Sequence, residues 1–310
     1  MQIENQHRKG IFFVLISAIS WGTFGVFSTL CLKAGLTDNT LVALSPLALL
    51  VYFAIRVLMK PKVLKGIPFW LVVCMFLHGA LIVNISNYAY TQAYVAGMPV
   101  AVVSSVVFCQ VFVVMIESVF VFKQKITLQK ALAAVLAVVG VSMALGLLGA
   151  SGGDVTFAGA LWTIVAAIFL GTGTVCSSFW LSKNVDSDAF LLILSIGSVL
   201  VMFTFFVSPA EFFTNLATVL SERNLSPWLS VFGLILIPNI CCYSMMMEGL
   251  KRISATTYAI IYSFDPVTAT ILGMVVFSQI VAPTQIAGIL IILFVVGYVN
   301  WVEGKAAMVS

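Results

Sequence analysis

Charged residues are scarce in this sequence. Asp, Glu, Lys and Arg together make up only 8% of its 310 residues, against about 25% in soluble domains. Hydrophobic residues make up 62%, against roughly 45–50% in such domains. Because most residues of a soluble chain must face water, this composition excludes an ordinary soluble domain. It predicts a protein whose solvent is largely lipid.

The sequence also lacks the patterns by which proteins hold metals or hydrolyse nucleotides. Its six cysteines lie mostly inside apolar runs and form no Cys-x-x-Cys pair, so we interpret them as small hydrophobic residues. No Walker Gly-x4-Gly-Lys-Ser/Thr motif occurs, which excludes ATP hydrolysis by this chain. We therefore expect neither a metal nor a cofactor.

One enzyme-like motif is present, at residues 149–153, where Gly-Ala-Ser-Gly-Gly matches both the hydrolase elbow and a rhomboid-protease signature. The elbow needs a strand before it and a helix after it, and a rhomboid site needs a later histidine. The two histidines, His7 and His78, both come earlier. An aspartyl intramembrane protease needs two deep acids, and only Asp265 is deep. We expect no catalytic residues and no enzyme.

Long apolar runs are abundant, and each has about the 20 residues that a membrane-spanning helix requires. The sequence thus predicts an all-α membrane protein with ten transmembrane helices. A longer connection, at 208–227, is expected to carry a short surface helix. The ten runs lie near residues 11–32, 39–59, 68–95, 98–122, 128–148, 157–181, 187–207, 228–250, 253–278 and 283–302.

Basic residues are distributed unevenly among the connections. With the N-terminus in the cytoplasm, all of the fifteen Lys and Arg residues except Lys33 and Arg223 fall on the cytoplasmic side. Cytoplasmic loops of membrane proteins carry such an excess. The pattern predicts a multi-pass protein of the cell membrane (plasma or inner) with both termini cytoplasmic. It also explains the net charge of +4 without a nucleic-acid partner.

Two motifs recur at about half the chain length. Phe-x-Gln occurs at 122–124 and 277–279, a separation of 155 residues. Ala-Ile-x-x-Gly-Thr occurs at 18–23 and 167–172, a separation of 149 residues. We therefore expect two repeats.

The repeats are expected to occupy residues 1–150 and 151–310, with five spans in each. An odd number of spans makes the second repeat enter the membrane from the opposite side. Inverted repeats of this kind are typical of secondary transporters, whose substrate site lies near the midplane between the halves.

Trp21-Gly22 in the first run and the phrases after the fourth and ninth runs resemble the EamA-type, ten-span branch of the drug/metabolite transporter superfamily. The family's usual Glu in those phrases is Gln124 and Gln279 here, which puts any carboxylate function there in doubt. The resemblance implies a central cavity lined by spans of both halves, with the fifth and tenth spans peripheral. Among members of the family, the branch that exports amino acids and related amphiphiles is considered first, while the resemblance itself does not fix the substrate.

Asp265 lies midway along the ninth run and directly precedes Pro266. On a helical wheel, Tyr258, Tyr262 and Asp265 share a face. A carboxylate beside two phenols suits a cationic amine, through charge pairing, hydrogen bonds and cation–π attraction. Acids at membrane depth are functional candidates by default. The alternative is that Asp265 caps the backbone group freed by Pro266 or pairs with His78.

Other polar residues are candidates for the same substrate site. The repeat spacing places Gln110 opposite Asp265, giving one site a neutral and an acidic end. Trp21 is a candidate for the cavity wall. The remaining candidates are in the third run: Asn84 and Tyr88, as cavity lining or as contacts between helices, and His78, as a proton carrier or a hydrogen-bonded structural residue.

No Lys or Arg lies deep in a run, which counts against sugar phosphates and nucleotide sugars, because such substrates need a cation in the cavity. Glu117 and Glu248 lie near run ends, where we expect solvated or paired acids, Glu248 with Lys251 and Arg252.

The function predicted is secondary transport of a small organic metabolite, most simply an amino acid or other amine, outward and by alternating access. Its partners would be this substrate, the lipid bilayer and, as a candidate, a coupled proton. The alternatives are a transporter of neutral aromatic or other non-amine metabolites and, more remotely, an intramembrane enzyme or receptor.

The predicted orientation can be tested by labelling single cysteines placed in a cysteine-free background. We expect a cysteine at Lys65 to resist an impermeant thiol reagent added outside intact cells, because the charge distribution places this loop in the cytoplasm. A cysteine at Lys33 should react. Reaction at position 65 from outside would contradict the orientation.

Overall fold

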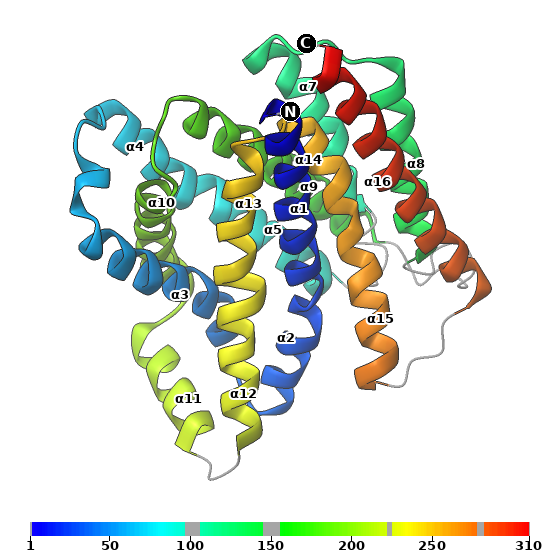
Figure 1. Ribbon diagram of the computed structural model, residues 1–310. Helices are drawn as coiled ribbons and strands as arrows, with labels where there is room; N and C mark the ends of the chain where they lie inside the picture. The colour runs from blue at the N-terminus through cyan, green and yellow to red at the C-terminus, as the bar shows by residue number, and fades with distance from the viewer. Residues whose placement is uncertain (1, 97–105, 145–155, 222–224, 278–281, 310) are drawn as a thin grey trace.

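The computed structural model describes residues 2–96, 106–144, 156–221, 225–277 and 282–309, and every regular element within these ranges is a helix. The helices form one bundle, and the two chain ends lie at the same end of it (Figure 1). Two chain ends at the same end of the bundle agree with a chain that crosses the membrane an even number of times.

Five of the ten expected spans are assembled from more than one of the helical segments described. The first half, up to residue 144, contains α1 (Gln2–Gly22), α2 (Phe24–Lys33), α3 (Asp38–Met59), η1 (Pro61–Leu64), α4 (Phe69–Leu77), η2 (His78–Val83), α5 (Asn84–Val95), α7 (Gln110–Phe122) and α8 (Leu128–Ala144). Here η1 is a 3-10 turn and η2 is π-helical.

The second half contains α9 (Phe157–Ser182), α10 (Ser187–Val201), η3 (Met202–Phe206), α11 (Pro209–Ser221), α12 (Leu225–Leu234), η4 (Ile235–Cys241), α13 (Cys242–Leu250), α14 (Ala255–Ile261), η5 (Tyr262–Phe264), α15 (Asp265–Phe277) and α16 (Pro283–Val309). The segments η3 and η4 are π-helical, and η5 is a 3-10 turn. Helix α11 confirms the short helix expected in the connection at 208–227.

Each of the ten expected runs contains helix, and six described helices are long and apolar enough to cross a membrane by length and composition. Three shorter apolar helices, Val106–Phe122, Leu128–Met143 and Pro283–Val299, lie in the fourth, fifth and tenth runs. The ninth run is divided between α14, η5 and α15. The helical membrane architecture is therefore present, and the count of ten spans stays a prediction. The Ser-containing motif at 149–153 lies outside the described residues.

Short polar side chains begin several of these helices. The side-chain oxygens of Thr37, Thr156, Asp186 and Ser254 each accept a hydrogen bond from a backbone N–H in the first turn of α3, α9, α10 and α14, respectively. Such caps satisfy N–H groups that have no partner within the helix. They define where these helices start.

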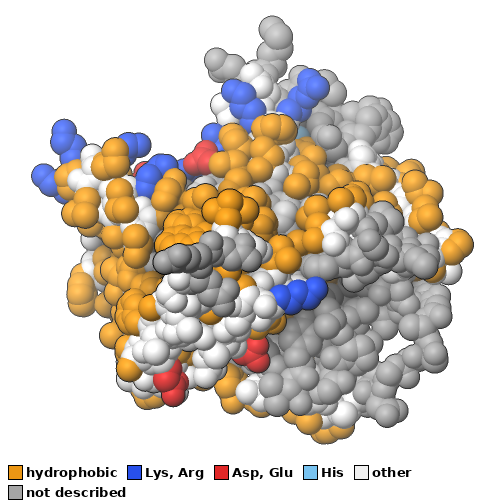
Figure 2. All heavy atoms as spheres, turned by 90° about the horizontal axis from the view of Figure 1, so that it is seen from below, with side chains coloured by type: hydrophobic (Ala, Val, Ile, Leu, Met, Phe, Trp, Pro, Cys, Tyr) orange, Lys and Arg blue, Asp and Glu red, His pale blue; other side chains and the backbone are white. Residues whose placement is uncertain are grey.

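Apolar side chains face both inward and outward. One large buried cluster includes Ile11 of α1, Phe53 of α3, Ile260 of α14 and Ile292 of α16. Large apolar side chains are also exposed, for example Phe157, with 86% of its surface accessible. Seen from below, hydrophobic side chains cover much of the described surface and acidic side chains are few (Figure 2). In water such a surface would aggregate, whereas lipid can cover it.

The third and seventh expected spans approach so closely that their backbones touch. A Cβ atom added at Gly79 of η2 would clash with the backbone carbonyl of Leu194 in α10, and one at Gly197 of α10 would clash with the carbonyl of Phe76. Neither neighbour is a flexible side-chain end. Glycine is therefore required on both sides of this contact.

We predict that Gly79→Ala will lower the apparent unfolding temperature, because overpacking a tight contact costs typically about 1–3 kcal/mol. Gly25→Ala is the matched control, since a Cβ atom there has no neighbour within 4 Å and alanine favours helix. Thermal unfolding of both detergent-purified variants would measure the difference. Equal stabilities would contradict the close packing.

Candidate functional site

The helix that carries Asp265 is interrupted in the middle. After α14 the chain makes the 3-10 turn η5, and Asp265 is the first residue of the new helix α15. Pro266 follows, and because it has no backbone N–H it cannot donate the α-helical hydrogen bond to the Tyr262 carbonyl, which accepts from the Asp265 N–H instead. The helix therefore changes its geometry at mid-span, and an acid lies at the change.

Four side chains around this break are connected by short contacts. The rings of Tyr258 and Tyr262 stack, with centroids 5.2 Å apart and planes 26° apart. The Tyr262 hydroxyl lies 3.8 Å from the Sγ atom of Cys242. The Ser17 hydroxyl lies 3.3 Å from the same sulfur and donates to the Cys242 carbonyl oxygen at 3.0 Å. We call Ser17, Cys242, Tyr258, Tyr262 and Asp265 the central cluster.

The Asp265 carboxylate is the charged member of this cluster. It lies near Cys242, Tyr258 and Tyr262, and the residue is partly accessible. Among the residues that the structure describes, none forms a hydrogen bond or ion pair with its side chain. An unpaired carboxylate away from water is unfavourable, so a cation or proton from outside the protein would stabilise it.

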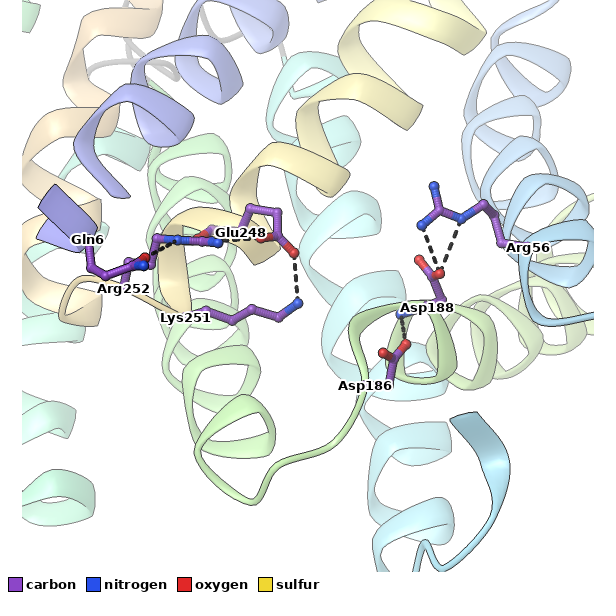
Figure 3. A network of polar contacts seen from close by, with 7 residues as sticks. All are labelled: Gln6, Arg56, Asp186, Asp188, Glu248, Lys251 and Arg252. Carbon is purple, nitrogen blue, oxygen red and sulfur yellow. Dashed lines mark hydrogen bonds and ion pairs between the residues drawn. The ribbon is translucent and has the colours of Figure 1, made fainter. Parts of the chain in front are cut away.

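Three other acids within helices, Glu117, Asp188 and Glu248, have partners. Glu248 forms ion pairs with Lys251 at 2.7 Å and Arg252 at 2.6 Å, which confirms the predicted pairing. The Arg56 guanidinium donates two bonds to one carboxylate oxygen of Asp188 at 2.9 and 3.1 Å, which connects α3 to α10 (Figure 3).

Glu117 of α7 is paired as well, by a neutral partner. The Thr172 hydroxyl of α9 donates a hydrogen bond to the Glu117 carboxylate at 2.7 Å. Asp265 differs from these acids because no described residue forms a hydrogen bond or ion pair with its carboxylate.

Trp21 is close to the central cluster, at the end of α1. Its ring stacks on Phe24, with centroids 5.0 Å apart, and meets Tyr243 edge-on at 6.4 Å. The next residue, Gly22, contacts α15 directly: a Cβ atom there would lie 2.7 Å from the Asp265 carbonyl oxygen. Trp21 and Asp265 are thus held near each other by the packing of α1 on α15.

Gln110 occupies the corresponding place in the first half. A Cβ atom at Gly171 of α9 would lie 3.1 Å from the Gln110 carbonyl oxygen. Gly22 and Gly171 are 149 residues apart, and Gln110 and Asp265 are 155 apart. These are the separations of the repeated motifs, so the same backbone contact occurs twice, each time between a glycine of one half and a carbonyl group of the other.

The candidates of the third span lie apart from the central cluster. The Trp180 indole donates to Nδ1 of His78 at 3.4 Å. Asn84 bonds to backbone carbonyls and to Ser198, and the Tyr88 ring contacts those of Trp162 and Phe206. In the described part of the chain, no hydrogen bond or ring contact joins His78, Asn84 or Tyr88 to the cluster. The alternative in which Asp265 pairs with His78 is not observed.

The structure adds Ser17 and Cys242, neither of which is among the predicted site residues. Cys242 is buried, with 2% of its surface accessible, as a small hydrophobic residue would be. Its thiol nevertheless lies between the hydroxyl groups of Ser17 and Tyr262. The amino-acid composition gives no sign of this polar environment. The signal for Ser17 is its position one helical turn before Trp21 on the same face of the first run.

A helix bundle with a mid-span acid and two similar halves defines a class, the helical membrane transporters. The EamA-like transporter family matches residues 8–146 and again residues 157–301. The chain therefore belongs to this family, which is part of the drug/metabolite transporter superfamily.

A solved structure described as "Crystal structure of protein" has the same fold. It has a TM-score of 0.75 and 17% sequence identity, and the alignment covers 97% of this chain and 99% of that one. Among curated proteins, none matches this sequence.

We predict that Asp265→Asn will raise the apparent unfolding temperature of the solute-free protein by a few degrees. The change keeps the side chain's size and removes a charge whose placement mid-span costs about 2.5–3.5 kcal/mol. Glu248→Gln is the control, because it breaks two ion pairs and should not stabilise. A fall in unfolding temperature for Asp265→Asn would show that the carboxylate is a structural partner.

Proposed function

We propose that this protein is a secondary-active transporter that exports a small amine-bearing metabolite, such as an amino acid, by alternating access. Membership of a transporter family supports transport of a small molecule. The observation that carries the substrate class is the mid-span Asp265 carboxylate, which has no partner among the described residues.

The central cluster has the chemistry that an ammonium group requires. A carboxylate forms charge-assisted hydrogen bonds with such a group, and the faces of the stacked Tyr258 and Tyr262 rings attract cations. An anion would instead be repelled by Asp265.

The surrounding side chains suggest the rest of the substrate. The Trp21 ring contacts those of Phe24 and Tyr243 beside the cluster, and these rings would suit an apolar or aromatic body. The same rings favour the alternative, a neutral aromatic metabolite. The two substrate classes differ in whether the charge of Asp265 matters for binding.

The proposed mechanism uses the two halves, residues 1–150 and 151–310, as inverted repeats in the cell membrane, with both termini in the cytoplasm. The equivalent contacts at Gly22 and Gly171 support this relation. Movement of one half against the other would expose Asp265 to each side in turn. A proton binding to the empty carboxylate would serve as the coupled ion, in exchange for the amine.

Substitution of Asp265 tests the proposal. A panel of amino acids and other amines is first screened for the compound that most raises the thermal stability of the wild-type protein, since binding to the native state stabilises it. We expect Asp265→Asn to weaken binding of that amine about tenfold to a hundredfold, because a hydrogen bond to a charged group contributes roughly 1.5–3 kcal/mol. Tyr262→Phe should weaken it less, since the ring face remains.

Binding and uptake into liposomes, measured side by side on Asp265→Asn, separate the alternatives. Normal binding with loss of concentrative uptake would assign Asp265 to the proton and remove it from the amine site. Wild-type values for both would contradict the proposal.

A further inference from the structure

Two π-helical segments occupy matching places in the two halves. Segment η2 interrupts the third expected span, and η4 interrupts the eighth. An asparagine lies at or near the end of each segment. Asn84 directly follows η2, and Asn239 lies near the end of η4. These asparagines are 155 residues apart, the separation that relates Gln110 to Asp265.

Both asparagines bind the backbone in the same way. The Asn84 amide donates to the carbonyl oxygens of Gly79 at 3.3 Å and Ala80 at 3.1 Å, and the Asn239 amide donates to that of Leu234 at 2.8 Å. In each half one acceptor lies five residues before the asparagine. Only 3% of Asn84 and 1% of Asn239 is accessible.

The energetic reason for these bonds is the membrane. A π segment departs from the regular helical ladder, and a backbone carbonyl without a partner costs several kcal/mol in hydrocarbon. The two amides supply hydrogen bonds to carbonyls at these segments. Each asparagine therefore stabilises a local backbone geometry that the lipid-embedded helix would otherwise avoid.

The two segments are connected through a pair of packed helices. Segment η2 packs against α10, α10 packs against α3, and α3 packs against η4. At the η2 end, Asn84 also donates to the Ser198 carbonyl of α10 at 3.2 Å and accepts from the Ser198 hydroxyl at 3.1 Å. A change at one π segment thus has a continuous packed route to the other.

Segment η4 also determines how the next helix faces the central cluster. It leads directly into Cys242 and Tyr243 of α13, which contact Tyr262 and Trp21, respectively. Because each residue of a helix turns by about 100°, a change from π to α geometry would rotate these side chains away from their partners. The backbone state of η4 and the shape of the candidate site are therefore coupled.

We propose that Asn84 and Asn239 are a symmetry-related pair of positioning residues, and that η2 and η4 are the paired hinges at which the two halves bend during transport. This inference rests on the proposed transport function. It requires the two segments to respond together, although they lie in different halves. A purely local structural role requires no such response.

Hydrogen exchange of the full-length protein in lipid nanodiscs distinguishes these roles without any solute. Asn84→Leu keeps roughly the side-chain volume and removes the amide donor. We expect at least about tenfold faster exchange of the η2 amides, the change that 1.4 kcal/mol of lost stabilisation would produce, together with a clear increase in η4. Asn239→Leu should give the reciprocal result. Ser198→Ala is the control, because it leaves every bond donated by Asn84 in place.

Faster exchange confined to the substituted segment, or no change, would overturn the hinge proposal. If Asn84→Leu does not fold, Asn84→Ser, which keeps a smaller donor, should show the same paired response at lower amplitude. Uptake of the amine found in the stability screen gives a second readout, with turnover reduced and affinity retained in both variants. If hydrogen exchange becomes faster in both segments but the protein binds no amine, the result would support the hinges and contradict only the proposed substrate.

Discussion

Inside a bilayer no water is present to satisfy polar groups, so backbone amides, carbonyls and charges need partners within the protein. Helices satisfy this constraint for most of the chain. The regular α-helix is interrupted at the segments η2, η4 and η5, and a polar residue lies at each of them. The side-chain amides of Asn84 and Asn239 donate hydrogen bonds to backbone carbonyls. By contrast, no described residue forms a hydrogen bond or ion pair with the Asp265 carboxylate. That difference is the reason for proposing Asp265, and not the asparagines, as the residue that binds a solute.

The two halves are more alike in their backbone contacts than in the side chains at equivalent positions. Gly22 and Gly171 make equivalent contacts with the carbonyl groups of Asp265 and Gln110, and the two asparagines make equivalent bonds. The side chains at the carbonyl positions differ, an acid in one half and an amide in the other. Under the proposed function, an acid at only one of these two positions would give the site a single charged end, which would match a substrate with a single ammonium group.

Much of the architecture could be predicted from sequence because hydropathy and spacing encode it. The apolar runs, the helix at 208–227, the ion pairs of Glu248 and the family all follow from composition, charge and repeated motifs. The face shared by Tyr258, Tyr262 and Asp265 follows from helical periodicity. The π segments do not follow, because an α and a π turn can have the same hydropathy. The thiol contacts of Cys242 depend on how α1 and α13 pack, which no local pattern specifies.

The central claim is that the carboxylate of Asp265 recognises a positive charge on the substrate. Its most direct test is uptake into liposomes of two compounds that differ in one group, the amine that best stabilises the protein and its analogue with a hydroxyl in place of the ammonium group. The account predicts uptake of the amine and at least about tenfold slower uptake of the hydroxyl analogue, the ratio that 1.4 kcal/mol of lost interaction produces. Equal uptake of the two compounds would contradict it.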